Sequence, residues 1–123
     1  MKNYIITVKT SGCEKYDTIT TVKVLSNVVA FCIDLYSIDY HGVEHGIFMY
    51  YEEDEEMYYI KFIINNFDWE YDIKETAEDL VSNLSRYGTF NDVSSEIKEV
   101  PEPTEIPENY IEHYYVNSYH DFY

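Results

Sequence analysis

Hydrophobic and polar residues alternate at the start of the chain, as they do in a β-strand with one buried face. Over residues 3–9 the side chains of Tyr4, Ile6 and Val8 occupy one set of alternate positions, and a Ser-Gly pair at 11–12 follows as a turn signal. A period of two residues places these side chains on one face of a strand. The pattern therefore predicts a first strand over residues 3–9.

The next stretch is rich in β-branched residues. Residues 18–25 fit a second strand, a Ser-Asn pair interrupts at 26–27, and residues 28–40 fit a longer strand with a bulge or bend near Leu35. Its inward positions would be Val29, Phe31, Ile33, Tyr36 and Ile38. A buried helix is the alternative for the first half of residues 28–40.

Two further β-rich runs, at 46–51 and 57–65, stand on either side of five consecutive acidic residues. This arrangement predicts a β-hairpin, and the mutual repulsion of the five charges keeps its tip in solvent. The acidic tip comprises Glu52, Glu53, Asp54, Glu55 and Glu56. A short extended piece is expected over residues 67–71.

One helix is well marked in the sequence. It is expected to begin near Thr76, with Asp79 three residues later as in a capping box, and with Glu75 and Glu78 near the positive end of the helix dipole. An apolar stripe of helical spacing follows, and Arg86 with the glycine at 88 gives a stop signal. The stripe consists of Ala77, Leu80, Val81 and Leu84.

The C-terminal region changes character. Residues 94–100 fit an edge strand, three prolines between 101 and 107 predict an extended linker, and residues 108–123 are acidic and rich in tyrosine. This last segment suits a short amphipathic helix, with a strand or disorder as alternatives.

We predict an α+β fold: an antiparallel sheet of about four to five strands with one main helix on one face. Residues 1–100 form this domain, and residues 101–123 pack on it.

The charge is large and unevenly placed. The 123 residues carry a net charge of -16, with 24 acidic against eight basic side chains, while 46% are hydrophobic and 18% aromatic. The hydrophobic content argues against disorder. Residues 1–24 hold four lysines against two acids, and the remaining 99 residues hold four basic side chains against 22 acids. Such a surface repels nucleic acid and anionic membranes and attracts basic partners.

Two features bear on the cell compartment. The chain has no apolar run of 18 residues, and its start alternates instead of forming the apolar block of a signal peptide. Cys13 and Cys32 have no metal-binding or redox spacing, and we interpret them as reduced thiols, with a single disulfide as the alternative. We expect a cytoplasmic protein.

The residues offer little for catalysis. His41, Glu44 and His45 match the H-x-x-E-H pattern of inverted zinc metalloproteases, whose histidines must share one helical face. Glycines at 42 and 46 indicate a β-turn there instead. His113 and His120 lack a companion ligand, and residues 52–56 lack the spacing of a calcium loop. We expect no enzyme activity, no metal and no cofactor, and a cryptic zinc enzyme is one alternative.

A second acidic array follows the hairpin. In an extended chain Asp68, Glu70 and Asp72 would share one face about 6.6 Å apart, with Trp69 and Tyr71 on the other. That spacing is comparable to the phosphates of one DNA strand, so arginines and lysines that hold phosphate could bind these carboxylates. Glu75, Glu78 and Asp79 would extend the array onto the helix, and Tyr71 would add contact area. Ordinary solubilising charge is the competing interpretation.

In size, acidity, tyrosine content and lack of catalytic motifs, the chain resembles the small phage-encoded inhibitors of bacterial defence, which are anti-CRISPR proteins and anti-restriction DNA mimics. The resemblance covers composition alone and assigns no residue. It implies binding to a basic surface of a nuclease, such as a CRISPR-Cas effector in the host cytoplasm, with no direct binding of nucleic acid. An immunity protein that neutralises a cognate toxin is the second alternative.

Overall fold

The computed structural model describes residues 2–35, 44–67, 73–87 and 90–108. Its elements follow in the order strand, helix, two strands, helix and strand. Their bounds are β1 Lys2–Thr10, α1 Thr18–Leu35, β2 Glu44–Glu52, β3 Met57–Phe67, α2 Ile73–Tyr87 and β4 Ser94–Val100. None of the helices among these residues is long and apolar enough to cross a membrane.

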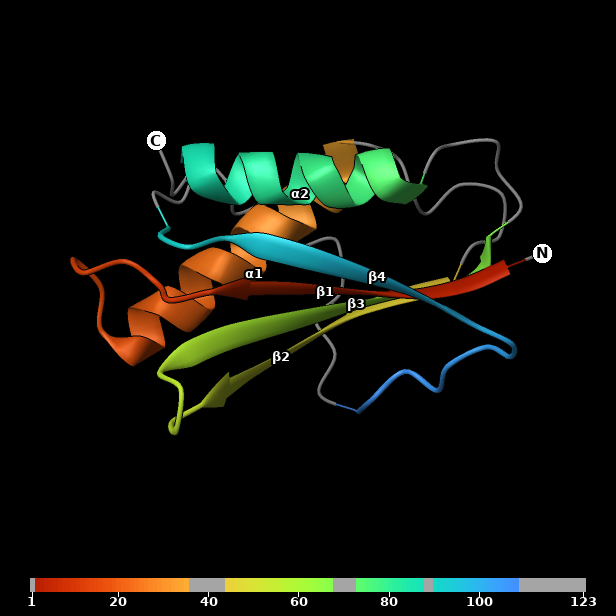
Figure 1. Ribbon diagram of the computed structural model, residues 1–123, viewed down its shortest axis with the longest axis horizontal. Helices are drawn as coiled ribbons and strands as arrows, with labels where there is room; N and C mark the ends of the chain where they lie inside the picture. The colour runs from red at the N-terminus through yellow and green to blue at the C-terminus, as the bar shows by residue number, and fades with distance from the viewer. Residues whose placement is uncertain (1, 36–43, 68–72, 88–89, 109–123) are drawn as a thin grey trace.

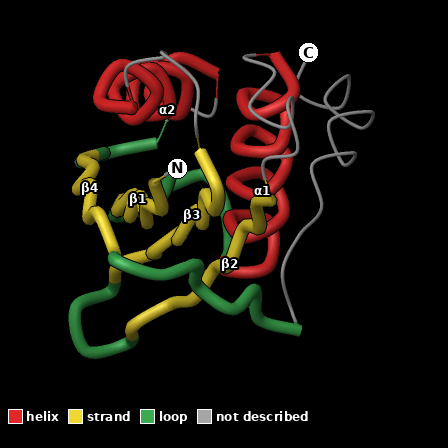
Figure 2. Tube along the Cα trace, turned by 90° about the vertical axis from the view of Figure 1, so that its right-hand side faces the viewer, coloured by secondary structure: helices red, strands yellow, loops and turns green. Residues whose placement is uncertain are grey.

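The four strands form one antiparallel sheet in the order β2-β3-β1-β4. Both helices lie on the same face of this sheet (Figures 1 and 2). The α+β prediction is therefore confirmed, with two helices among the described residues in place of one main helix. The predicted hairpin and the predicted strand over 94–100 are also confirmed, and β4 lies at an edge of the sheet.

Alternation along the strands builds the core. Ile6 of β1 lies opposite Phe62 of β3, and Phe62 lies opposite Ile47 of β2, so these three buried side chains form one row under the helices. Val8 and Ile60 form the next row. Helix α2 adds its apolar stripe, since Ala77, Leu80 and Leu84 are buried as predicted.

The prediction of strands over residues 18–25 and 28–40 is wrong as far as Leu35, because Thr18–Leu35 is helix α1; for the first half of 28–40 the helix given as the alternative is the correct interpretation. Residues 36–40 lie outside the described part. The helix has an N-cap that the strand interpretation overlooked: the backbone N–H of Thr20 donates to Oδ1 of Asp17 at 2.7 Å. Leu25, Val28 and Val29 are fully buried. Tertiary burial of this face outweighs the preference of β-branched residues for strands.

The start of the second helix also differs from the prediction. Helix α2 begins at Ile73, so Thr76 lies inside the first turns, is 3% exposed and is not the N-cap. The predicted glycine stop at 88 and the predicted extended piece at 68–71 fall outside the described residues. The acid at Glu75 does lie in the first turn, where it favours the helix dipole.

The other face of the sheet carries no helix among the described residues, and a segment after β4 crosses part of it (Figure 2). The side chain of Asn65 clamps this segment: its Nδ2 donates to the carbonyl of Thr104 at 2.7 Å, and the N–H of Thr104 donates to its Oδ1 at 2.9 Å. Asn65 and Ile63 are only 2% and 3% exposed although both point away from the helices. We call residues 101–108 the strap.

Candidate acidic binding surface

The tip of the β2–β3 hairpin is a tight turn. The N–H of Glu56 donates to the carbonyl of Glu53 at 3.2 Å, and all five acidic residues of the tip are exposed. Glu56 has φ of 52°, in the left-handed region that glycine and asparagine adopt more readily than glutamate. The turn therefore holds a glutamate where the backbone would favour another residue.

Two tyrosine pairs lie directly beneath the tip, one on each face of the hairpin. Tyr50 stacks on Tyr59 with ring centroids 4.9 Å apart and planes 5° from parallel. On the helix-covered face, Tyr51 lies 4.6 Å from Tyr58. Both are cross-strand neighbours in the β2–β3 register. Such aromatic pairs stabilise a hairpin, so the tip stands on a stiff base.

A hydrogen bond links this base to the acidic tip. The phenol of Tyr59 donates to Oε2 of Glu55 at 2.7 Å, and this bond raises the pKa of Tyr59 to about 12. Burial raises the pKa of the neighbouring Tyr50, and the negative charge of Glu52 adds to the effect. The pKa values of both tyrosines are therefore raised, by burial at Tyr50 and by the bond to Glu55 at Tyr59, while Tyr59 holds one carboxylate in place.

No basic residue interrupts this region of the sequence. Between positions 44 and 60 there are six acids and no lysine or arginine. The nearest base along β3 is Lys61, which lies opposite Phe48 and Thr7 on the face away from the helices. Lys9 and Lys98 point to the same face by their strand positions. The acidic tip itself thus carries no base, but the sheet face that adjoins it is lysine-bearing, with Lys9 directly opposite Tyr59 at the base of the tip.

The second group of predicted acids lies elsewhere. Glu75 and Glu78 are exposed on the first turns of α2, and Asp79 is half-buried. These turns lie at the opposite end of the molecule from the tip, because strand β3 runs the length of the sheet between them (Figure 1). The tip and the helix acids therefore form two separate acidic sites instead of one continuous face. The remaining predicted residues, Asp68, Glu70, Tyr71 and Asp72, lie outside the described residues.

The two described residues of the H-x-x-E-H pattern, Glu44 and His45, lie in a strand and not in the helix that zinc proteases need. Glu44 and His45 are the first two residues of strand β2, so their side chains point to opposite faces of the sheet. Glu44 is exposed, whereas the His45 ring lies 5.8 Å from the ring of buried Phe62. His41, His113 and His120 fall outside the described residues. Within the described ranges no three metal-binding side chains gather.

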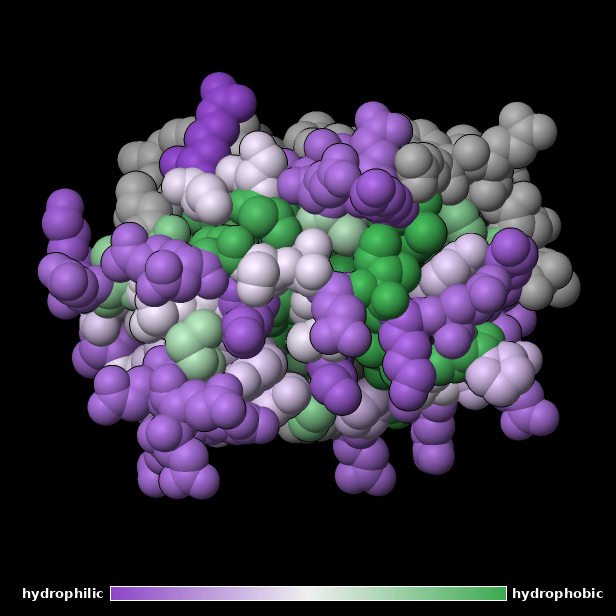
Figure 3. All heavy atoms as spheres, viewed as in Figure 1, coloured by the Kyte–Doolittle hydropathy of each residue, from purple (hydrophilic) through white to green (hydrophobic). Residues whose placement is uncertain are grey.

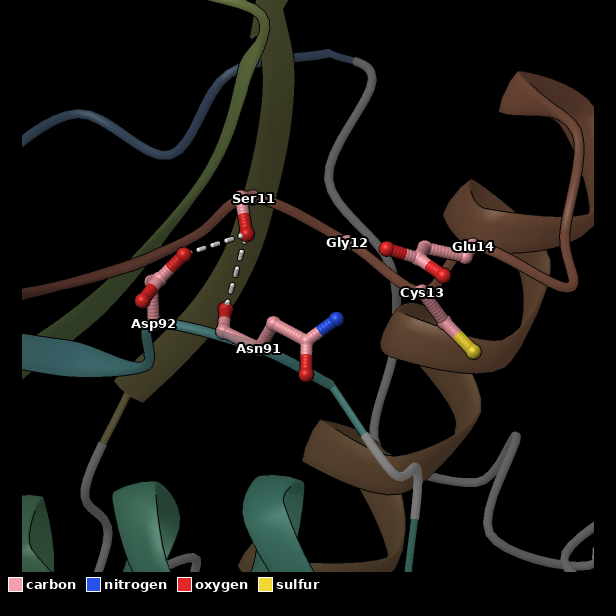
Figure 4. A pocket seen from close by; sticks show the side chains of 6 residues that line it. All are labelled: Ser11, Gly12, Cys13, Glu14, Asn91 and Asp92. Carbon is pink, nitrogen blue, oxygen red and sulfur yellow. Dashed lines mark hydrogen bonds between the residues drawn. The ribbon is translucent and has the colours of Figure 1, made fainter.

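An open hollow of roughly 510 Å³ lies where β1 ends, lined by Ser11, Gly12, Cys13, Glu14, Asn91 and Asp92 (Figure 4). Its polar groups bind one another. Ser11 donates its hydroxyl to Oδ2 of Asp92 at 2.9 Å, and the backbones of Gly12 and Asn91 form an isolated bridge. We interpret these bonds as structural, because they join the end of β1 to the segment before β4. Cys13 at its rim is a thiol.

Sequence reasoning missed the tyrosine pairs as part of this surface. The signal was present, because a Tyr-Tyr dipeptide stands on each side of the acidic tip, at 50–51 and 58–59. Pairing the two dipeptides requires the hairpin register, which follows once the turn is placed at residues 53–56.

Comparison of the chain with protein-family models, with curated proteins and with solved structures gave no match.

Proposed function

We propose that this protein is an inhibitor that binds a basic, nucleic-acid-binding surface of a host defence nuclease, such as a CRISPR-Cas effector, by mimicking DNA. The observation that carries the proposal is the hairpin tip, where five consecutive exposed carboxylates stand on a base of two tyrosine pairs. Arginine and lysine side chains that donate hydrogen bonds to phosphates can donate them to carboxylates at the same positions.

Rigidity supports this proposal over simple solubilising charge. A flexible acidic loop loses conformational entropy when it is bound, whereas a preorganised one loses less. The stacked tyrosines and the bond from Tyr59 to Glu55 hold the tip in one shape before any partner arrives. Tyrosine also contributes contact area with a polar end, which is common in protein interfaces.

The backbone of Glu56 gives a second argument. A non-glycine residue in the left-handed region costs about 1 kcal/mol, and such outliers gather at functional sites. Glycine or asparagine would relieve the cost but remove a charge. A glutamate at this strained position is expected if its negative charge takes part in binding a partner.

The matched test compares two triple variants that remove the same charge. One neutralises the tip with Glu52→Gln, Glu53→Gln and Asp54→Asn; the other neutralises α2 with Glu75→Gln, Glu78→Gln and Asp79→Asn. The tip residues are chosen because none donates or accepts the bond to Tyr59. Each protein is titrated against purified Cas effectors, and the displacement of duplex DNA is measured at low and high salt.

We expect the tip variant to bind at least about tenfold more weakly, mainly through slower association, with a smaller salt dependence. The α2 variant should stay within about twofold of the unmodified protein. Equal losses in both variants would reduce the effect to net charge and contradict a site at the tip. If every effector still binds DNA normally at a saturating concentration of this protein, the proposed target is wrong. If the protein instead blocks a nuclease toxin, it is an immunity protein.

A further inference from the structure

Strand β4 leaves one of its edges open. It is the last strand in the order β2-β3-β1-β4 and, in the described part of the chain, it pairs with β1 alone. Figures 1 and 3 look at this edge, and in Figure 2 it forms the outer margin of the sheet beneath α2. The outer N–H and C=O groups of an edge strand are ready to pair with another strand.

We propose that β4 pairs with β4 of a second copy of this chain, antiparallel and centred on Ile97, to form a symmetric dimer with one continuous sheet. In this register Ile97 lies opposite the partner's Ile97, Glu96 lies opposite the partner's Lys98, and Lys98 lies opposite the partner's Glu96. Two unlike-charge pairs and one apolar pair then occupy the middle of the interface.

The strand alternation selects this register. Directly opposed residues in an antiparallel pair have their side chains on the same face of the sheet. The two-fold axis of a symmetric pairing must therefore pass beside a residue that lies opposite its own copy, and the possible registers differ in which residue that is. Glu96 and Lys98 lie on the lysine-bearing face, opposite Thr7 and Ile5 of β1. Centring on Glu96 would oppose two glutamates, and centring on Lys98 would oppose two lysines. Only the register through Ile97 pairs both charges with their opposites.

The other free edge is unsuited to the same contact. Strand β2 carries Glu44 and Glu52 at its ends and no lysine or arginine. Self-pairing about its centre would place Glu44 opposite the partner's Glu52 on both sides of the axis. Like charges directly opposite one another destabilise strand pairing, so β4 is the edge with self-complementary charge.

Apolar surface next to β4 favours the same contact. Ile97 is only partly buried against the core, and Val100 is half-buried as well. Figure 3 shows apolar side chains reaching the surface between α2 and β4 on this side of the molecule. A second copy paired along β4 would bring its own α2 and β4 beside this surface and cover part of it.

The net charge of -16 on each copy opposes the dimer. Screening by salt reduces this long-range repulsion more than it weakens contacts inside a closed strand pair. The dimer should therefore strengthen as salt rises, whereas binding to a basic target should weaken. The inference goes beyond the proposed function, and its test uses the purified chain alone, so the two can fail separately.

The test is sedimentation equilibrium of the full chain at about 0.05 M and about 0.5 M salt, with three variants of β4. Lys98→Glu and Glu96→Lys each create two like-charge pairs across the axis and should each weaken the dimer by about tenfold. The double variant Glu96→Lys with Lys98→Glu restores both unlike pairs and the native net charge, and it should return the dissociation constant to within about twofold of the native value.

Lys9→Glu is the matched control. It makes the same charge change on the same face, but on β1, which already has a partner strand on each side. This control should leave dimerisation within about twofold of the native protein at high salt. A monomer at every salt concentration, equal weakening by Lys9→Glu and Lys98→Glu, or a double variant no better than the single ones would overturn the proposal. So would growth into larger, open-ended assemblies.

Discussion

Tyr59 donates a hydrogen bond of 2.7 Å to Glu55, across the base of the acidic tip. The bond requires a protonated phenol and a charged carboxylate, which is why the pKa of Tyr59 is raised to about 12. Because the folded pKa lies above the ordinary value of 10.0, the stability from this bond is complete below pH 10 and is lost as pH rises toward 12.

The first prediction concerns this bond. Glu55→Gln should lower the pKa of Tyr59 toward its ordinary value, because the charged acceptor is removed. The measurement is an NMR titration of Tyr Cζ signals, with Tyr59→Phe to assign the resonance. Glu53→Gln removes one charge from the same exposed tip without touching the bond, and it should leave the titration nearly unchanged. Equal shifts in the two variants would mean that general charge, not the bond, sets the pKa.

The second prediction concerns the N-cap of α1. Bonds from the backbone and the side chain of Thr20 lower the pKa of Asp17 below its ordinary 3.8. A depressed folded pKa gives stability that is present above about pH 4 and lost as pH falls through the folded value. Asp17→Ala should destabilise the protein at neutral pH, measured by urea unfolding.

Asp17→Asn separates capping from charge. Asparagine caps helices about as well as aspartate but does not titrate, so this variant should keep its stability at neutral pH and lose less of it on acidification. The comparison is the slope of unfolding free energy against pH below about pH 4. Identical slopes for the native protein and Asp17→Asn would rule out a contribution from this carboxylate.

The third prediction concerns Gly12. Its φ is +93°, and a Cβ placed there would come within 3.0 Å of Cε2 of Tyr58. Gly12→Ala combines backbone strain with overpacking and should cost about 2 kcal/mol of unfolding free energy. Ser11→Ala, one residue earlier and exposed, should cost less than about 1 kcal/mol. A Gly12→Ala variant as stable as Ser11→Ala would contradict the conformation described for this turn.

The fourth prediction concerns the strap. Asn65→Leu removes both side-chain bonds to the backbone of Thr104 and leaves its part-buried N–H and carbonyl without that partner, which should cost about 1–2 kcal/mol. The amide of Thr104 should then exchange its hydrogen much faster. Thr104→Ala is the control, because Asn65 contacts only the backbone there. Slow exchange of residue 104 in Asn65→Leu would show that other contacts hold the strap.

The hairpin, the apolar stripe of α2 and the edge strand could be predicted because each carries a strong local signal. The segment 18–35 could not, since its β-branched residues favour strands and only burial on the sheet decides for the helix. Its local sign was Asp17, which caps the helix. Asp17 at the cap position, followed by apolar residues of helical spacing at Val22, Leu25 and Val29, is the sequence pattern that indicates this helix.

The acidic tip was predicted as an exposed surface from repulsion alone. Its separation from Glu75, Glu78 and Asp79 was not, because the distance between two acidic groups depends on the direction of β3 between them. The stiffness of the tip was missed for a similar reason. It comes from the pairing of Tyr50 with Tyr59, which needs the register of two strands and cannot be read from either one.

The central place of β1 bears on how the chain reaches its native state. Strand β1 precedes the other strands in the sequence but lies between β3 and β4, so its pairing with β3 joins residues about half the chain apart and its pairing with β4 joins residues separated by most of the chain. Contacts so distant in sequence form slowly. Until residues 94–100 are synthesised, the edge of β1 that pairs with β4 has no partner strand, and a chain truncated before that point would present this unpaired edge to other nascent chains.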